Sequence, residues 1–130
     1  LSRIGVIIKL AIDENGNRIE AQKENKGYCP LCNEQLIAAC GSIYSNYWRH
    51  KNNNCDIWHQ NETEWHICWK NSFPVEWQEV VIIKDGKRHF ADIKTEKGII
   101  IEFQNSPIII QTIREREVFY EQMVWVINGK

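Results

Sequence analysis

The sequence lacks any apolar run that approaches the roughly 18 residues of a membrane span. It also lacks a segment that resembles a secretion signal. The two absences argue against a membrane protein and predict a cytoplasmic location. An excess of one charge is missing as well, since 16 Lys and Arg stand against 17 Asp and Glu. This near balance excludes nucleic-acid binding through a positive field of the whole molecule, so such binding requires a local basic patch.

Composition and length set the size of the fold. A chain of 130 residues, with 43% hydrophobic and 25% charged residues, is ordinary for one globular domain with at most a small appendage. It opens on Leu1 in place of methionine, which indicates a processed form or a piece of a longer protein. The five cysteines are an odd number, and a reducing cytoplasm disfavours disulfides. Metal binding is therefore the first interpretation of the clustered cysteines.

Four residues have the spacing of a zinc site. Two cysteines stand two residues apart, a histidine follows after seventeen more, and a further cysteine comes shortly after it; the set is Cys29, Cys32, His50 and Cys55. Thiolate and imidazole ligands suit tetrahedral zinc, and a closed set of four is typical of a structural site. His59 is the alternative fourth ligand, whereas Cys40 and Cys68 are predicted to be buried small residues. The simpler interpretation is a group of unrelated buried cysteines.

The first 60 residues are predicted to be a β-rich zinc-binding segment. Apolar residues 4–12 lead into the turn sequence DENGN, and residues 18–21 resume the pattern, which predicts a hairpin. Residues 27–60 are polar, with short strand-like pieces and little material for a core. Such a segment needs a stabilising cross-link in addition to its core, and a bound zinc ion would supply one.

Residues 62–73 have helical periodicity. Trp65, Cys68, Trp69 and Phe73 form an apolar stripe, with Asn61 as the expected N-cap and Pro74 as the stop. The stripe is predicted to face the core. Residues spaced by four form a polar ridge on the opposite side, and a solvated face is the simpler interpretation of that ridge. Its members are Glu62, His66 and Lys70.

The rest of the chain predicts a mixed α+β unit over residues 61–130. Strands are expected at 75–84, 88–95 and 99–104, joined by turns at Asp85-Gly86 and Lys97-Gly98. A helix at 111–122 and a buried strand at 123–127 follow. The predicted order is therefore α-β-β-β-α-β.

Two carboxylates are predicted to meet on neighbouring strands of this unit. Glu102 and Gln104 share a strand face, and Asp92 lies across from Glu102 if the strands are in register. A magnesium ion prefers oxygen ligands, which two neighbouring carboxylates and several water molecules would supply. Such an ion can activate a water molecule for attack on a phosphodiester. This interpretation predicts a metal-dependent nuclease. A solvated sheet face with cross-strand charge pairs is the alternative.

The segments ETEWHICWK, ADI, IEFQNSPI, REREVFY and MVWV together resemble the competence protein CoiA family. The similarity runs from Cys29 to the last strand and implies a core like the PD-(D/E)XK, or restriction-endonuclease-like, nuclease fold. It implies Asp92 and Glu102 as ligands of a catalytic Mg²⁺ or Mn²⁺. Gln104 stands where that fold usually has a lysine, so the stabilising charge has to come from elsewhere. Lys70, Lys94 and Arg116 are the candidates.

The resemblance also implies roles for the helices. On the first helix, Glu64 and His66 stand where the fold often adds an acidic ligand or a substrate-facing group, and Glu62 competes with Glu64. On the second, Arg116 and Tyr120 share a face that suits phosphate contact. Internal pairing of Arg116 with Glu117 or Glu121 is the simpler alternative.

Two functions follow from these patterns. The first is a nuclease that hydrolyses DNA with Mg²⁺ or Mn²⁺, in DNA uptake or recombination, with Asp92, Glu102, Gln104, Glu64 and His66 as site residues. Lys70, Lys94, Arg116 and Tyr120 are its expected nucleic-acid contacts. The second is a non-cleaving module with a degenerate nuclease fold that binds DNA or a competence or recombination partner. The form of the DNA and the oligomeric state are open on this sequence.

Overall fold

The computed structural model describes residues 7–40, 46–51, 55, 56, 58 and 63–129. The fold is mixed α+β, with more strands than helices, which confirms the predicted class. Contacts divide the chain into two compact units. The first contains residues 1–62 and 88–90, and the second contains residues 63–87 and 91–130. Neither α-helix of the described residues is long and apolar enough to cross a membrane.

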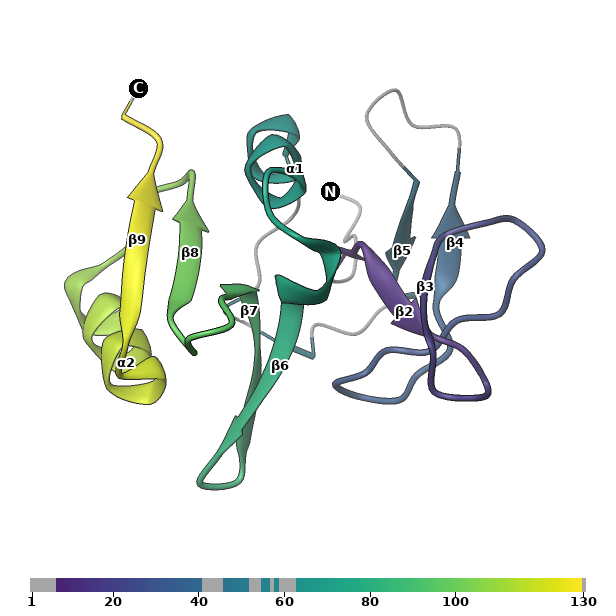
Figure 1. The fold of residues 1–130 in the computed structure, drawn as a ribbon, viewed down its shortest axis with the longest axis horizontal. Coiled ribbons are helices and arrows are strands. Elements are labelled where there is room, and N and C mark those ends of the chain that lie inside the picture. Colours follow the sequence, from purple (N-terminus) through teal and green to yellow (C-terminus); the bar gives the residue numbers. More distant parts are fainter. Residues whose placement is uncertain (1–6, 41–45, 52–54, 57, 59–62, 130) are drawn as a thin grey trace. The chain divides into compact units, whose positions relative to one another are not determined.

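The described part of the first unit consists of short strands and turns (Figure 1). Its strands are β1 (Ile7–Ile8), β2 (Leu10–Ile12), β3 (Arg18–Glu20), β4 (Ile37–Ala39) and β5 (Tyr47–Arg49). They form a three-stranded sheet in the order β1-β5-β4 and a separate β2-β3 hairpin. The hairpin confirms the prediction for residues 10–20, whereas Ile7 and Ile8 of the predicted strand pair with β5 and residues 4–6 lie outside the described residues. Asp13 Oδ1 accepts hydrogen bonds from the backbone N–H groups of Asn15 and Asn17, which closes its turn.

Trp48 fills the small core of the first unit. Its side chain is fully buried, and its indole Nε1 donates a hydrogen bond to the backbone oxygen of Ile19 at 3.1 Å. The indole therefore joins the three-stranded sheet to the hairpin. Its neighbour Arg49 is half-buried. The unit buries more apolar side chains than the sequence predicted, since other large ones are buried as well: Ile7, Ile8, Leu10, Leu31 and Leu36.

The second unit has the predicted order of elements. They are α1 (Glu64–Asn71), a 3₁₀ turn η1 (Val75–Trp77), β6 (Gln78–Lys84), β7 (Lys87–Lys94), β8 (Ile100–Gln104), α2 (Ile110–Tyr120) and β9 (Met123–Ile127). The sheet order is β6-β7-β8-β9, with β7 and β8 antiparallel and β8 and β9 parallel. The β6–β7 turn has positive φ at Asp85 and Gly86, as the sequence predicted. Residues 88–90 of β7 belong to the first unit.

Three features of the second unit differ from prediction. Helix α1 is shorter, because Thr63 caps it by accepting a hydrogen bond from the His66 backbone N–H at 3.3 Å. Helix α2 begins at Ile110 and ends at Tyr120, without the predicted residues 121 and 122. The last strand is not buried, since Val124 and Ile127 of β9 are exposed to 51% and 66%. Strand β9 is at the end of the sheet order, and an edge strand has a neighbour on one side only.

The burial of the polar side of α1 also differs from prediction. His66 and Lys70, expected on a polar outer ridge, are buried at 4% and 1% exposure. Cys68 is exposed, so the prediction that it belongs to the core is wrong. Trp69 is partly exposed and stacks on buried Phe103 of β8 at 5.6 Å between ring centroids. The aromatic stripe thus packs on β8 as a partial cover, while the polar pair enters the interior.

Candidate functional site

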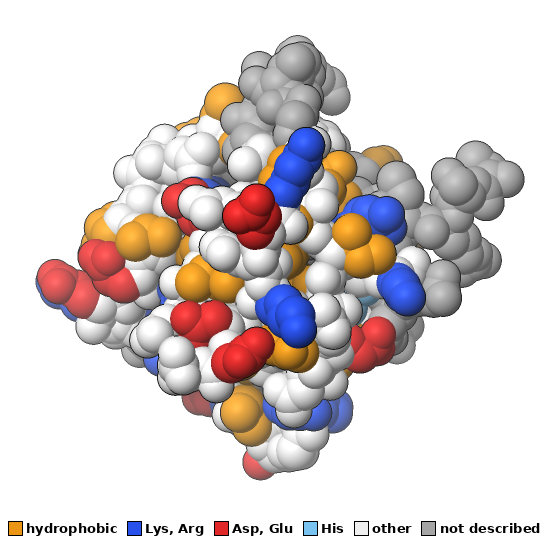
Figure 2. Space-filling model, turned by 90° about the vertical axis from the view of Figure 1, so that its right-hand side faces the viewer, with side chains coloured by type: hydrophobic (Ala, Val, Ile, Leu, Met, Phe, Trp, Pro, Cys, Tyr) orange, Lys and Arg blue, Asp and Glu red, His pale blue; other side chains and the backbone are white. Residues whose placement is uncertain are grey.

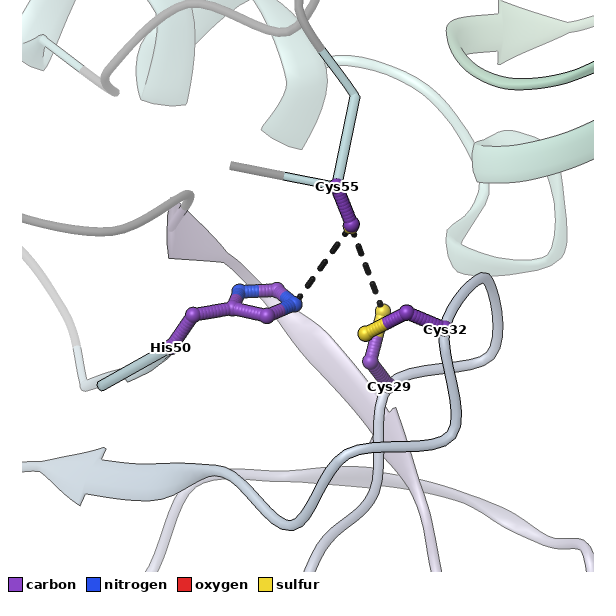
Figure 3. A group of neighbouring side chains, drawn as sticks. All are labelled: Cys29, Cys32, His50 and Cys55. Atoms are coloured by element: carbon purple, nitrogen blue, oxygen red, sulfur yellow. Dashed lines mark hydrogen bonds between the residues drawn. The ribbon is translucent and has the colours of Figure 1, made fainter. Parts of the chain in front are cut away.

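A group of three cysteines and one histidine lies in the first unit. Cys29 and Cys32 lie on a tight turn, in which the Asn33 N–H donates to the Cys29 backbone oxygen at 2.9 Å. Asn33 has a φ of 65°, and asparagine adopts this left-handed backbone more readily than most residues. His50 directly follows β5, and Cys55 comes from the loop after it. Figure 3 shows the four side chains pointing toward one another.

The separations between these side chains match those of a tetrahedral metal. The Sγ atoms of Cys29 and Cys55 are 3.9 Å apart, and Cys55 Sγ lies 3.5 Å from His50 Nε2. All four ligand atoms lie within 4.8 Å of one another. Zinc bonds of about 2.3 Å to sulfur and about 2.0 Å to nitrogen imply tetrahedral edges of roughly 3.8 Å and 3.5 Å. The donor set can therefore bind a metal such as zinc.

The pKa shifts of the three cysteines also favour a cation bound between their sulfur atoms. Hydrogen bonding from Cys55, with a further contribution from His50, lowers the pKa of the Cys29 thiol to about 4. The same contact with Cys29, together with burial, raises the pKa of Cys55, and burial raises that of Cys32. Several thiolates this close repel one another, so only one ionises readily without a positive charge between them. A divalent cation would remove that repulsion.

The predicted ligand set of Cys29, Cys32, His50 and Cys55 is thus brought together. Among the residues that the structure describes, it is the one group of three or more His, Cys, Asp or Glu side chains with converging ligand atoms. The alternative ligand His59 lies outside the described residues. Cys40, predicted to be buried, is half-buried.

Asp56, next to the candidate ligand Cys55, fixes part of strand β7 within the first unit. Its buried carboxylate accepts hydrogen bonds from His89 Nδ1 at 2.8 Å and from the Phe90 N–H at 2.7 Å. Trp58 stacks on the His89 ring at 3.6 Å between centroids. Burial alone would raise the pKa of Asp56, but the hydrogen bonds from His89 and Phe90 outweigh it and lower the pKa. No periodic pattern in the sequence predicts this contact, since Asp56 and His89 are 33 residues apart.

The second group of polar residues lies where β7 and β8 separate in the second unit. Backbone pairing of these strands reaches Ile93 and Ile101. Beyond it, Glu102 Oε2 accepts a hydrogen bond from the Asp92 N–H at 2.8 Å, and Asp92 Oδ2 accepts one from the Phe103 N–H at 2.9 Å. The two carboxylates therefore replace the missing carbonyl acceptors of the ladder, and Asp92 and Glu102 lie together as the sequence predicted.

Two cations accompany the carboxylates. Lys70 Nζ lies 3.0 Å from Glu79 Oε2 and 3.9 Å from Asp92 Oδ1. Arg116 of α2 donates to Glu102 Oε1 at 3.2 Å and lies over the Trp125 ring at 5.7 Å. Of the candidates for the stabilising charge, Lys70 and Arg116 reach the carboxylates. Arg116 pairs with Glu102, which is not one of the predicted alternatives Glu117 and Glu121, and Glu121 pairs with Lys84.

Other predicted site residues have different surroundings. His66 contacts Thr63 Oγ1 through Nδ1 at 2.8 Å and the Phe103 backbone oxygen through Nε2 at 3.1 Å, so both ring nitrogens are engaged. Gln104 is buried, and its amide Nε2 donates to the Ser106 backbone oxygen at 2.6 Å. Tyr120 is buried beside Phe119.

Lys94 is exposed at the end of β7. Glu64 is the first residue of α1, and its side chain lies outside the description. The rival acidic residue Glu62 lies outside the described residues altogether. The structure therefore brings Asp92, Glu102, Lys70 and Arg116 into one carboxylate cluster, and we use this name for these four residues together with Glu79.

Glu79 is the member of the carboxylate cluster that the sequence analysis missed. It begins the second unit's sheet beside Gln78, and both side chains are buried to 2% exposure. Gln78 and Glu79 directly precede the apolar run from Val80 to Ile83. The sequence offered no signal that singles out Glu79, since Glu76, three residues earlier, is also acidic and is exposed.

Comparison with known proteins supplies no relative for the chain: no protein-family model, no curated protein and no solved structure matches it significantly.

Proposed function

We propose that the second unit is a divalent-metal-dependent nuclease that hydrolyses DNA phosphodiester bonds. The observation that carries this proposal is the carboxylate cluster, in which Asp92 and Glu102 from neighbouring strands meet cations from both helices. Buried charges are costly to maintain, and a concentration of them is more frequent at functional sites than elsewhere.

The order and pairing of the elements support a restriction-endonuclease-like core. A helix, an antiparallel three-stranded meander, a second helix and a parallel fourth strand follow one another in the second unit. The carboxylates stand on the second and third strands of this series. This arrangement agrees with the resemblance to the competence protein CoiA family, and membership of that family, with a role in DNA uptake or recombination, is part of the proposal.

The residues of the cluster fit a magnesium or manganese ion. Asp92 and Glu102 offer oxygen donors, which these ions prefer. Asp92 Oδ1 lies beyond hydrogen-bond distance from Lys70, and its side chain keeps 14% exposure to solvent. Asp92 and Glu102 would hold the ion, which when bound supplies Lewis-acid activation of water and of the phosphate.

The remaining residues of the site act on the substrate or on one another. Lys70 is proposed to supply the positive charge that Gln104 lacks, because its ammonium lies beside Asp92. Gln104 is proposed to align the attacking water through its side-chain oxygen, while its Nε2 is held by Ser106. His66 is proposed to hold α1 against β8, since its hydrogen bonds to Thr63 and Phe103 engage both ring nitrogens.

DNA contact is proposed to be local. Figure 2 shows one face of the molecule, on which acidic and basic side chains both occur and neither sign covers that face. A net charge of −1 adds no long-range attraction for a polyanion. The exposed Lys94, two residues from Asp92 on β7, is the proposed phosphate contact beside the site.

The first unit is proposed to bind one zinc ion in a structural role through its Cys₃His group. All four ligand positions are then filled by protein, which is the arrangement of structural zinc sites. The ion would tie the turn at Cys29 and Cys32 to the residues that follow β5.

The experiment is cleavage of labelled single-stranded, duplex and branched DNA with Mg²⁺ or Mn²⁺. We expect Asp92→Asn and Glu102→Gln each to reduce the rate by about 100-fold or more, because each removes a charged ligand of the ion. The matched controls are Asp85→Asn, in an exposed turn, and Glu115→Gln, exposed on α2. Cleavage that persists in the Asp92 and Glu102 variants would contradict the proposal.

A second candidate is a module that binds DNA or a protein partner without cutting. The observation in its favour is that Lys70 and Arg116 already neutralise part of the negative charge of Asp92 and Glu102. Under this alternative the wild-type protein retains DNA in a filter-binding assay with chelator present and cuts none of the substrates. Loss of binding in chelator, together with metal-dependent cleavage, would exclude it.

A further inference from the structure

Glu79 has a backbone conformation that glutamate rarely adopts. Its φ is 48°, in the left-handed region, although it lies within strand β6. A side chain with a Cβ atom is strained there, and such strain persists only where the surrounding structure enforces it. Glu79 is also almost fully buried, at 2% exposure. A strained and buried carboxylate is therefore held in place by specific contacts.

The positive φ lets two consecutive side chains reach the same helix. Along a regular strand, neighbouring side chains point to opposite faces. Here Gln78 Nε2 donates to the backbone oxygens of Lys70 at 2.8 Å and Phe73 at 3.0 Å. The next residue, Glu79, accepts from the side chain of the same Lys70 at 3.0 Å. The Gln78 side chain thus holds the end of α1 through backbone oxygens of that segment. The Glu79 side chain holds it through the ammonium of Lys70.

The Lys70 ammonium lies between two carboxylates at unequal distances. It is 3.0 Å from Glu79 and 3.9 Å from Asp92, so the hydrogen bond is made with Glu79. We propose that Glu79 is a positioning residue of the carboxylate cluster, which holds Lys70 back from Asp92 and so leaves Asp92 able to bind a divalent cation. This inference rests on the proposed metal-dependent function of the same cluster.

Removal of the Glu79 charge releases Lys70 toward Asp92. A buried ammonium that loses its nearest carboxylate turns to the remaining one, because an unpaired buried charge is unfavourable. A closer Lys70–Asp92 pair then competes with the divalent cation for the same oxygen. Substitution of Glu79 should therefore weaken metal binding, although Glu79 itself is not a ligand.

The test compares Glu79→Gln with Glu121→Gln in the full chain. Glu121 is a close control, since it also has positive φ (65°) and also pairs with a lysine, Lys84, but it is 67% exposed. Mn²⁺ affinity is measured by titration of the metal alone, and cleavage is measured in parallel. We expect Glu79→Gln to weaken Mn²⁺ binding by about 10-fold to 100-fold and to lower kcat, with KM for DNA unchanged. Glu121→Gln should change neither.

Two further variants separate positioning from mere folding. Glu79→Asp keeps the charge on a shorter side chain and should recover part of the Mn²⁺ affinity. The double variant Lys70→Met with Glu79→Leu replaces the ion pair by apolar groups of similar size; it should bind Mn²⁺ about as tightly as wild type, because no ammonium competes, but cut slowly. A folded Glu79→Gln protein with wild-type Mn²⁺ affinity would overturn the inference.

The two proposals fail in different ways. If the wild-type protein cuts no DNA but Glu79→Gln still weakens Mn²⁺ binding, the nuclease function is wrong and the positioning role of Glu79 stands. If the wild-type protein cuts DNA and Glu79→Gln matches it in both measurements, the positioning role is wrong and the nuclease function stands. A wild-type protein that neither binds Mn²⁺ nor cuts DNA overturns both.

Discussion

Gly27 illustrates how single residues decide the packing of the first unit. A Cβ atom added at this position would lie 2.7 Å from the Trp48 ring and 2.8 Å from the Cβ of Ala11. Carbon atoms do not approach this closely without displacement of one of them. The missing side chain of Gly27 is therefore what allows the indole to fill the core between the sheet and the hairpin.

Gly27→Ala should accordingly destabilise the protein. The Trp48 indole is fully buried and cannot move aside easily, so we expect a loss of about 1–3 kcal/mol in the free energy of unfolding. Chemical denaturation with Trp fluorescence measures the change. The control is Gly129→Ala, where no atom lies within 4 Å of the added Cβ. Equal stability of the two variants would show that the Trp48 contact relaxes without cost.

Helix α1 shows how tertiary contacts determine which face of an element is buried. Its aromatic residues follow the period of an amphipathic helix, yet its most deeply buried residues are His66 and Lys70. On one side of α1, the rings of Trp65 and Trp69 pack against the ring of Phe103. The polar side chains find partners in Thr63, Phe103 and Glu79. A polar side chain can be buried at little cost once it is hydrogen-bonded. The orientation of α1 therefore depends on the available hydrogen-bond and ion-pair partners as well as on hydropathy.

The Lys70–Glu79 pair should respond as a buried unit in a double-mutant cycle. Lys70→Met leaves Glu79 as a buried charge without its ammonium, which should cost about 3–5 kcal/mol in unfolding free energy. Adding Glu79→Leu should restore part of that loss, because neither charge then remains buried. The comparison is Lys84→Met, which breaks the exposed pair with Glu121 and should cost about 0–1 kcal/mol. Additive effects of the two buried substitutions would refute the pairing.

At the scale of the whole molecule, a metal in the Cys₃His group has consequences beyond its own loop. Cys55 is one of the four residues that could bind the metal, and the adjacent Asp56 accepts hydrogen bonds from His89 and Phe90 of β7. Residues 88–90 therefore belong to the first unit although they lie within a strand of the second unit's sheet. Each unit keeps its own set of internal contacts.

Removal of the metal should loosen the first unit selectively. We expect about one zinc per chain by elemental analysis of wild type and of Cys68→Ser, whose cysteine is exposed, and none in Cys29→Ser. Zinc chelation should abolish hydrogen-exchange protection in β4, β5 and residues 88–90, while β8 and β9 stay protected, and added zinc should reverse the loss. Metal-free protein with full protection would contradict a structural zinc ion.

The sequence by itself determined the local features of this protein. Turn residues such as Asp13 and Gly86 predicted the hairpins, because their backbone preferences act within four residues. The spacing of Cys29 and Cys32 predicted that the Cys₃His group forms, since a tight turn brings both thiols to one side. The periodicity of hydrophobic residues predicted the order of helices and strands, although it placed both ends of α1 and the C-terminal end of α2 too far out.

Only the tertiary structure decided which charges meet. Glu79 and Lys70 are nine residues apart, Asp56 and His89 are 33 apart, and no periodicity links either pair. Their pairing depends on how α1, β6 and β7 pack, and on a strained backbone at Glu79 that no local preference favours. Burial made these contacts specific, because a charge removed from water has to find its partner within the fold.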